Sequence, residues 1–227
     1  MSNKQLVKSK SGLRMVSTSD ADRSPFLLEE PHWEDDALFP NCVKCNIKFD
    51  FTHRRHHCRR CGRVFCNNCC DNKVMLERLS FVDPVRVCEQ CSHVAKKEEE
   101  FFSKHLKLLC HGARFIIDDS APLTFVCKLE NKTHRTILFE CDGDAHHDPV
   151  ALISLVSVQL ITEKEGEHIN GIVLKYKEQG NVLEVHLHAV LSPEAERRHS
   201  LAWIAAMQRV RNGLFYIQYF NFEISVD

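Results

Sequence analysis

Four pairs of cysteines, each with two residues between its members, constrain this chain more than any other feature of its sequence. The pairs are Cys42 and Cys45, Cys58 and Cys61, Cys66 and Cys69, and Cys88 and Cys91. Two intervening residues allow both sulfurs of a pair to reach one metal ion, so eight thiols predict two tetrahedral zinc sites. Because four thiolates leave no open coordination position, both sites are expected to be structural and not catalytic.

The rest of the sequence favours reduced cysteines in the cytoplasm. The chain has 227 residues, of which 12 are cysteine. Residues 1–20 contain no apolar segment like that of a secretory signal peptide, so we expect free or metal-bound thiols rather than disulfides. The longest apolar run, residues 151–161, is about half the length of a membrane-spanning helix. Any membrane contact is therefore expected to be peripheral.

A basic segment runs directly into the second cysteine pair. Residues 54–62 read RRHHCRRCG, which places arginine and histidine beside metal ligands. The whole chain has a formal net charge of −1, so this basic character is local. Two zinc ions, each held by four thiolates, would offset much of it. The pattern predicts a few well-placed arginines that bind an anion, and it argues against nucleic acid, which favours a broad basic surface.

Three motifs around the cysteines resemble those of the FYVE zinc finger family. They are WxxD at residues 33–36, RRHHCR at 54–59 and RVC at 86–88. The resemblance implies a cross-brace, in which the first and third cysteine pairs hold one zinc ion and the second and fourth pairs hold the other. Two metal ions then stabilise a module that is too small to rely on an apolar core. Cys70 directly follows Cys69 and is a ninth thiol that neither site needs.

The resemblance also implies a ligand, the headgroup of phosphatidylinositol 3-phosphate. Guanidinium groups bind two phosphate oxygens at once, and a carboxylate accepts hydrogen bonds from inositol hydroxyls while it disfavours further phosphates. The residues expected to bind the headgroup are Asp36, Arg54, Arg55, His56, His57, Arg59 and Arg86. Phe51 and Thr52 are expected to insert into the bilayer, whereas Phe49 is expected to pack inside the finger.

Two further segments flank the finger, which is assigned to residues 25–95. Residues 1–24 are polar, rich in Ser and Lys and without periodicity, which is typical of a disordered tail. An amphipathic helix is predicted from Ser92 to about Cys110, and its residues 96–111 serve as a linker helix. Its apolar stripe consists of Val94, Phe101, Phe102, Leu106 and Leu109.

Residues 112–227 are predicted to form short strands followed by one helix. Strands are expected at 113–117, 123–129, 136–139, 150–161, 172–176 and 182–188. Ser192 as N-cap and Pro193 at the first helical position predict where the helix begins. This order of elements resembles the pleckstrin homology superfold. The predicted fold class is therefore small α+β, with a two-zinc cross-brace finger followed by a pleckstrin-homology-like β-barrel with a C-terminal helix.

The C-terminal domain is expected to bind proteins rather than lipid. Its first inter-strand loop, residues 118–122, reads DDSAP, which is acidic where a phosphoinositide-binding member of the superfold would carry Lys and Arg. No enzyme is expected, since Cys110, Cys127 and Cys141 have no histidine placed to activate them and are expected to be buried structural thiols.

The function that these patterns favour is that of a non-enzymatic adaptor in the cytoplasm, peripheral on early endosome membranes. Its expected partners are membranes that carry phosphatidylinositol 3-phosphate, unidentified proteins at the C-terminal domain, and a second copy of the chain in a weak homodimer. Two alternatives stay open: a FYVE-like finger that mainly binds a small GTPase or another protein, and a RING-like ubiquitin ligase component. The intact RRHHCR motif argues against the second.

Overall fold

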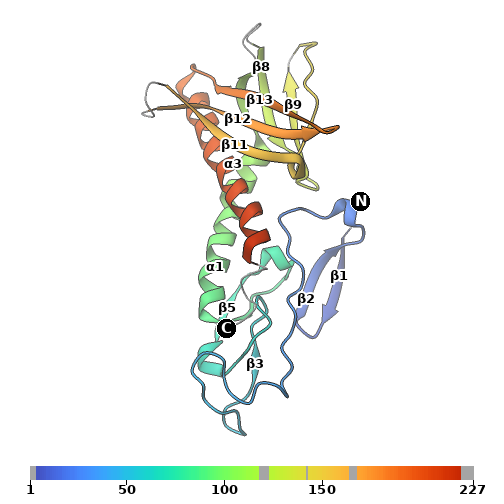
Figure 1. Ribbon diagram of the computed structural model, residues 1–227, viewed down its shortest axis with the longest axis vertical. Helices are drawn as coiled ribbons and strands as arrows, with labels where there is room; N and C mark the ends of the chain where they lie inside the picture. Colours follow the sequence, from blue (N-terminus) through green and yellow to red (C-terminus); the bar gives the residue numbers. More distant parts are fainter. Residues whose placement is uncertain (1–3, 118–122, 142, 164–167, 221–227) are drawn as a thin grey trace. The chain divides into compact units, whose positions relative to one another are not determined.

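The computed structural model describes residues 4–117, 123–141, 143–163 and 168–220. The chain separates into two compact units, Met1–Ser103 and Lys104–Asp227. Figure 1 follows the chain through both units. The finer domain boundaries, after residues 24, 95 and 111, stay a prediction.

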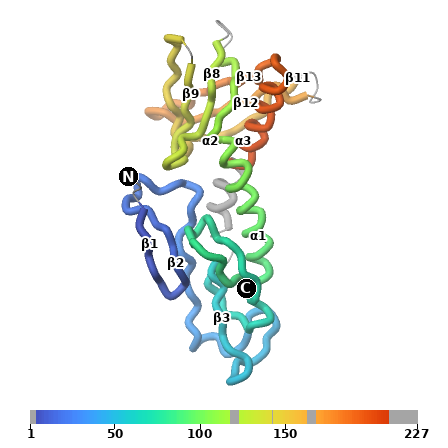
Figure 2. Tube along the Cα trace, turned by 180° about the vertical axis from the view of Figure 1, so that it is seen from behind, coloured from blue at the N-terminus to red at the C-terminus, as the bar shows by residue number. Residues whose placement is uncertain are grey.

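A β-hairpin occupies much of the segment for which the sequence predicts a disordered tail. Strands β1 (Lys4–Ser9) and β2 (Gly12–Ser17) pair antiparallel, and a short 3-10 turn, η1 (Asp20–Asp22), follows (Figure 2). The hairpin packs on the finger through its backbone, since Met15 N donates to Ser80 O at 2.8 Å and Val82 N donates to Leu13 O at 3.1 Å. These contacts with a distant part of the chain provide order that the polar composition alone does not predict.

The finger contains little regular secondary structure. Strand β3 (His56–His57) pairs with β4 (Val64–Phe65), and β5 (Asn72–Val74) pairs with β6 (Val85–Val87). Two 3-10 turns, η2 (Asn67–Cys69) and η3 (Glu77–Leu79), connect these elements. The buried cluster consists of cysteines and a few apolar side chains: Phe49, Val64, Phe65, Leu76, Leu79, Phe81, Val87 and Ala95. A core this small depends on metal for most of its stability.

The predicted amphipathic helix consists of three helical segments. Helix α1 (Glu89–Glu100) begins earlier than predicted, a π-helical segment η4 (Phe101–Leu106) follows, and α2 (Lys107–His111) ends at Gly112. Leu106 and Leu109 are buried as the apolar stripe predicts. Val94 is 41% exposed, because Cys91 and Ala95 are the residues of α1 that face the core of the finger.

The described residues of the second unit form one antiparallel sheet of seven strands. Their order is β10 (Val150–Ala151), β9 (Thr136–Cys141), β8 (Leu123–Leu129), β7 (Ala113–Ile117), β13 (Asn181–Ala189), β12 (His168–Glu178) and β11 (Leu155–Glu163). The predicted strand at 150–161 is divided by a 3-10 turn, η5 (Leu152–Ser154). Because the two-residue strand β10 and strand β11 are the unpaired edges, the sheet is open where the sequence predicts a closed barrel. Loop 118–122 lies outside the described residues.

The C-terminal helix packs against this sheet through a buried tryptophan. Helix α3 (Glu194–Phe220) begins one residue after the predicted position, and the Pro193 carbonyl accepts its first backbone hydrogen bonds. Trp203 is 0% exposed, its ring centroid lies 5.2 Å from that of Phe115, and its indole N–H donates to Leu109 O. Ser200 Oγ donates to Arg114 O at 2.7 Å. Within the described residues, no helix has the length and apolar character that crossing a bilayer requires.

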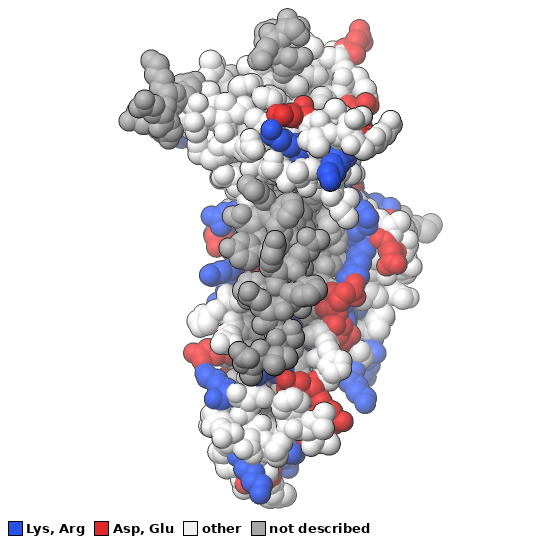
Figure 3. All heavy atoms as spheres, viewed as in Figure 1, with Lys and Arg blue, Asp and Glu red and all other residues white. Residues whose placement is uncertain are grey.

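Glu98 on α1 connects the helix to two arginines of the finger. Its Oε1 lies 2.8 Å from Arg60 Nη2 and 3.1 Å from Arg78 Nη1, and all three side chains are at most 21% exposed. Acidic and basic side chains are also interspersed on the visible face of the finger unit (Figure 3). Because its guanidinium group pairs with Glu98, Arg60 stabilises the packing of α1 and does not contribute to an anion site.

Glu98→Gln should destabilise the finger. The substitution leaves two largely buried guanidinium groups without their shared counter-charge, which is expected to cost about 3 kcal/mol of unfolding free energy. Chemical denaturation at saturating zinc measures this loss. The matched control is Glu99→Gln on the exposed face of the same helix, which should stay within about 0.5 kcal/mol of the parent. Equal stability of the two variants would contradict the structural role of Glu98.

Candidate functional site

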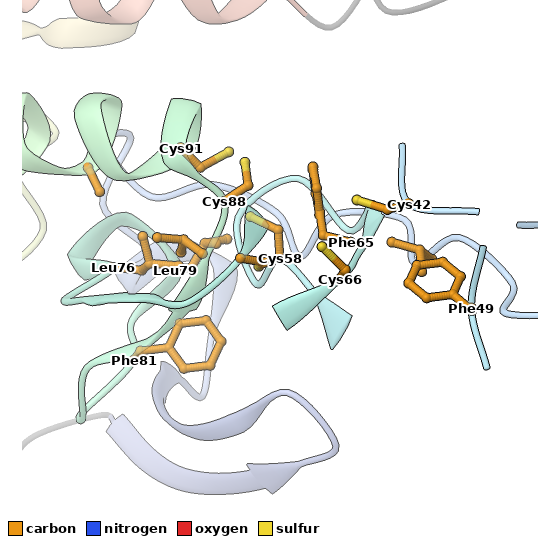
Figure 4. Packing of buried hydrophobic residues seen from close by; sticks show 14 residues of the cluster. Cys42, Phe49, Cys58, Phe65, Cys66, Leu76, Leu79, Phe81, Cys88 and Cys91 are labelled. Atoms are coloured by element: carbon orange, nitrogen blue, oxygen red, sulfur yellow. The ribbon is translucent and has the colours of Figure 1, made fainter. Parts of the chain in front are cut away.

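The structure gathers the eight paired cysteines into two groups of four. One group is Cys42, Cys45, Cys66 and Cys69, and the other is Cys58, Cys61, Cys88 and Cys91. In each group the sulfur atoms all lie within 4.8 Å of one another, close enough to bind one metal ion. Figure 4 shows Cys58, Cys88 and Cys91 gathered together, apart from Cys42 and Cys66. These are the groups that the cross-brace implies, and their all-thiolate donor sets fit two structural zinc ions.

Cys70 lies against the second group without belonging to it. Its side chain is 0% exposed and hydrogen-bonds the sulfur of Cys58. This hydrogen bond, together with burial and the nearby negative charge of Cys58, raises the pKa of Cys70 well above that of an ordinary thiol. Cys70 is therefore a buried neighbour of the cluster that lies outside its ligand set, a role that its spacing did not reveal.

Gly62 allows the WxxD segment to pack against the second cysteine group. Its φ of 73° is in the left-handed region, and a Cβ at this position would come within 1.9 Å of His32 O. The backbone amide of Glu34 donates to Gly62 O at 3.1 Å. A glycine is thus required for the segment that carries Trp33 and Asp36 to reach the basic strand.

Three arginines influence His56 on β3: Arg54 and Arg59 of the RRHHCR motif, and Arg86 of strand β6. Burial lowers the pKa of His56, and the positive charges of Arg86, Arg59 and Arg54 lower it further. Arg59 N donates to Arg86 O at 3.0 Å, which joins the end of the RRHHCR motif to strand β6. We call this group, His56 with Arg54, Arg59 and Arg86, the cationic cluster. Its concentrated positive charge suits a phosphate.

Backbone carbonyls hold two guanidinium groups of the cationic cluster in place. Arg59 Nη1 donates to His57 O at 2.6 Å, and its guanidinium carbon lies 5.5 Å from the ring centroid of Trp33. Arg86 Nη1 donates to Cys70 O at 2.7 Å and to Asn67 Oδ1 at 2.9 Å. Each guanidinium group has five N–H donors. These contacts therefore orient the group and leave its remaining N–H donors available to bind an anion.

His57 connects the WxxD segment to the basic strand. Its Nε2 lies 2.7 Å from Glu34 O, and its ring centroid lies 4.7 Å from that of Trp33. Asp36 Oδ1 lies 3.9 Å from the same Nε2, and the Asp36 side chain is 61% exposed. The structure thus places Asp36 beside the basic strand, while His57 is already occupied by contacts within the finger.

Arg55 makes contacts of its own within the finger. Its guanidinium carbon is 4.9 Å from the ring centroid of Phe49, and its Nε donates to Phe39 O at 3.2 Å. Arg63 pairs with a carboxylate instead, since its Nε lies 3.5 Å from Glu34 Oε1. Neighbouring arginines of the basic segment therefore have different surroundings, and the spacing of the sequence does not distinguish them.

A tight turn presents Phe51 to solvent three residues before Arg54 in the sequence. Asp50 Oδ1 accepts from Thr52 Oγ1 at 2.7 Å and from the backbone amides of Thr52 and His53 at 2.8 Å. These hydrogen bonds, led by the Thr52 hydroxyl, hold the pKa of Asp50 well below its usual range. Phe51 is 87% exposed, whereas Phe49 is 7% exposed and packs inside the finger as expected. Sequence reasoning did not single out Leu38, a second apolar side chain of the finger that is 74% exposed.

The geometry of the cysteine groups predicts two zinc ions per chain. Cys58→Ser should lose zinc and unfold the finger, because it removes a ligand. Cys70→Ser is the matched control, since it removes a buried thiol in contact with the same group but outside the ligand set, and it should retain both ions. Elemental analysis of the purified chains checks both outcomes. A single zinc in the parent, or loss of zinc from Cys70→Ser, would contradict the ligand sets.

Comparison with known proteins matches the finger and the second unit separately. The FYVE zinc finger model matches residues 32–97. The model described as zinc finger FYVE domain-containing protein 21 C-terminus matches residues 100–216.

Several curated relatives share the finger region with this chain. Zinc finger FYVE domain-containing protein 16 of Mus musculus is 45% identical over 73 residues, which cover 32% of this chain and 5% of that protein. Zinc finger FYVE domain-containing protein 9 of Homo sapiens is 48% identical over 66 residues, 28% of this chain and 4% of that protein. Phosphatidylinositol-3,5-bisphosphate 3-phosphatase MTMR4 of Mus musculus is 40% identical over 81 residues, 35% of this chain and 7% of the phosphatase. The chain thus spans only a small part of the length of these relatives.

Two solved structures are similar over the same part of the chain. The VHS and FYVE tandem domains of Hrs, a protein involved in membrane trafficking and signal transduction, share 37% identity over 30% of each chain, with a TM-score of 0.28. The LM5-1 FYVE domain from Leishmania major shares 33% identity over 31% of this chain and 83% of that one, with a TM-score of 0.29.

The two family models together cover the finger and most of the second unit. Because the C-terminal model alone matches residues 100–216, half of the 227 residues, the chain belongs to the family of zinc finger FYVE domain-containing protein 21.

Proposed function

We propose that this protein is a non-enzymatic adaptor whose finger binds phosphatidylinositol 3-phosphate at the cytoplasmic surface of early endosomes. The observation that carries the proposal is the cationic cluster in a finger that also exposes Phe51, three residues before Arg54 in the sequence. Arg54, Arg59 and Arg86 act together on His56, and the turn at Asp50 projects a large apolar side chain. A phosphorylated headgroup attached to a lipid combines the two chemistries that these features recognise.

The charges favour a headgroup with a single phosphate on its inositol ring. Planar guanidinium groups from Arg59 and Arg86 supply paired donors for one phosphomonoester. Asp36, exposed beside His57, would accept hydrogen bonds from ring hydroxyls and repel an additional phosphate at that side. His56 adds a further donor. Arg55 belongs to the proposed headgroup site as well, and its guanidinium group also lies over the ring of Phe49.

Membrane attachment requires both the headgroup and the insertion loop. Phe51 contributes apolar area, and Thr52 keeps the turn closed through its hydrogen bond with Asp50. Burial of one Phe side chain contributes roughly 1.5 to 3 kcal/mol, which alone is too little for stable attachment. Specific headgroup binding and insertion therefore act together.

The second unit is proposed to hold the protein partners of the adaptor. Its antiparallel strand order and C-terminal helix support a pleckstrin-homology-like arrangement in which the sheet stays open. The open edges at β10 and β11 are surfaces where another chain could pair. The same proposal includes a weak homodimer formed by two copies of this chain.

Arg59→Ala should reduce affinity for vesicles that contain phosphatidylinositol 3-phosphate at least tenfold. The reason is the loss of charge-assisted hydrogen bonds, which contribute about 1.5 to 3 kcal/mol. Vesicle sedimentation measures the affinity, and elemental analysis verifies that zinc is retained. Arg63→Ala removes the same charge outside the cationic cluster and should bind within about twofold of the parent. Equal binding by parent and Arg59→Ala would show that the arginines only neutralise the thiolates, and would favour a finger that binds protein.

Phe51→Ser should weaken vesicle binding about tenfold or more but leave binding of the soluble headgroup unchanged. The difference arises because insertion buries apolar area only when a bilayer is present. Titration with soluble inositol 1,3-bisphosphate, followed by vesicle sedimentation, separates the two steps. Val94→Ser, which replaces an exposed apolar side chain on α1, should alter neither measurement. A parallel loss in both assays would mean that Phe51 shapes the headgroup site and does not insert.

A further inference from the structure

The N-terminal hairpin carries an exposed basic surface within a chain that is nearly neutral. Residues 4–17 contain Lys4, Lys8, Lys10 and Arg14 and no acidic residue. Arg14 is used internally, since Nη1 lies 2.7 Å from Glu30 Oε2 and Nε donates to Leu79 O. The three lysines are exposed, and among the described residues none of them has an acidic partner. Their charge is therefore available to something outside the chain.

The same surface carries an apolar pair. Leu6 on β1 and Met15 on β2 are directly opposite in the register, and they are 57% and 39% exposed. Because side chains alternate along a strand, Leu6 shares its face of the hairpin with Lys4 and Lys8. The opposite face packs on the finger, where the Arg14 guanidinium carbon lies 5.7 Å from the ring centroid of Phe81 and a Cβ at Gly12 would come within 3.1 Å of that ring. The outward face thus combines cationic and apolar side chains.

The turn of the hairpin contacts the cationic cluster. Ser11 O accepts from Arg59 Nε at 3.4 Å, and Ser11, only 5% exposed, donates from its hydroxyl to Glu30 Oε1 at 2.8 Å. Lys10 is adjacent to Ser11 in the turn and is exposed. In Figure 2 the hairpin runs from the N-terminus toward the part of the finger that holds β3. A headgroup at Arg59 would therefore bring the hairpin turn close to a membrane.

We propose that the hairpin is a second membrane-contact element, in which Lys4, Lys8 and Lys10 attract anionic phospholipid headgroups while Leu6 and Met15 enter the interface. The proposal rests on the proposed function, because the Arg59 site is what brings this face to the bilayer. The absence of acidic residues in the hairpin complements the negative surface of a cytoplasmic leaflet. Each lysine near such a surface is expected to raise affinity about fivefold, and the effect decreases with salt.

The test compares the zinc-loaded full chain with Lys4→Gln/Lys8→Gln/Lys10→Gln on three kinds of vesicle. These are phosphatidylcholine alone, phosphatidylcholine with phosphatidylinositol 3-phosphate, and the latter with added phosphatidylserine. Phosphatidylserine should increase binding of the parent at least tenfold and that of the triple variant by much less, and high salt should remove the difference. Without phosphatidylserine the two should bind within about twofold. The control, Lys96→Gln/Lys97→Gln/Lys107→Gln, removes three exposed lysines of α1 and α2 and should behave like the parent.

The outcomes separate the two proposals. If the parent does not depend on phosphatidylinositol 3-phosphate, the proposed function fails. If that dependence holds but parent and triple variant gain equally from phosphatidylserine, the hairpin proposal is overturned and the proposed function stands. A parent that gains nothing from phosphatidylserine also overturns it, and leaves an acidic protein as the partner of this face.

A second measurement tests the apolar pair independently of charge. In vesicles that contain both anionic lipids, brominated lipid should quench the tryptophan fluorescence of Leu6→Trp more than that of the parent. Val94→Trp, which places the tryptophan on α1, should show no more quenching than the parent does. Equal quenching of the two variants would exclude insertion of Leu6.

Discussion

Thiolate coordination of two metal ions is the constraint on which the finger depends. The two groups of cysteines interlock along the chain, since the first and third pairs form one group and the second and fourth form the other. Strand β3 leads directly into Cys58, and Cys91 lies in the first turn of α1. The direction of the RRHHCR segment and the start of the helix are therefore both set by the second group. Loss of that metal would disperse the cationic cluster, because few apolar contacts could hold it together.

The arginines of the finger divide into two roles that their sequence does not distinguish. Arg60 and Arg78 share Glu98 and stabilise the packing of α1. Arg59 and Arg86 are oriented by backbone carbonyls and lie near His56. Burial costs a guanidinium group less when a carboxylate accompanies it, so the paired arginines can be structural. In the proposed function, Arg59 and Arg86 supply N–H donors to an external anion, so that the placement of the arginines matters more than the total charge.

The two units are stabilised by different means. The finger relies on metal, whereas the second unit has an apolar core in which Trp203 contacts Phe115 and α3 covers the sheet. Burial raises the pKa of Cys110 to about 11 and that of Cys127 still further, so both remain neutral thiols within this core. Cysteine thus acts as a metal ligand in one unit and as a small apolar side chain in the other.

Local patterns in the sequence predicted the features that depend on neighbouring residues. The structure agrees with the predicted cysteine pairs, with the basic segment beside Cys58, and with strands such as Ala113–Ile117 and Leu123–Leu129. Each of these features is specified over a few residues.

Tertiary structure alone decided the features that join distant residues. The hairpin at Lys4–Ser17 is ordered by contacts with Ser80 and Phe81, and a backbone hydrogen bond joins Arg59 of the basic segment to Arg86 of β6. The sheet is open because its two edge strands, β10 and β11, do not pair with each other. Such contacts depend on the path of the whole backbone, and no short stretch of sequence contains that information.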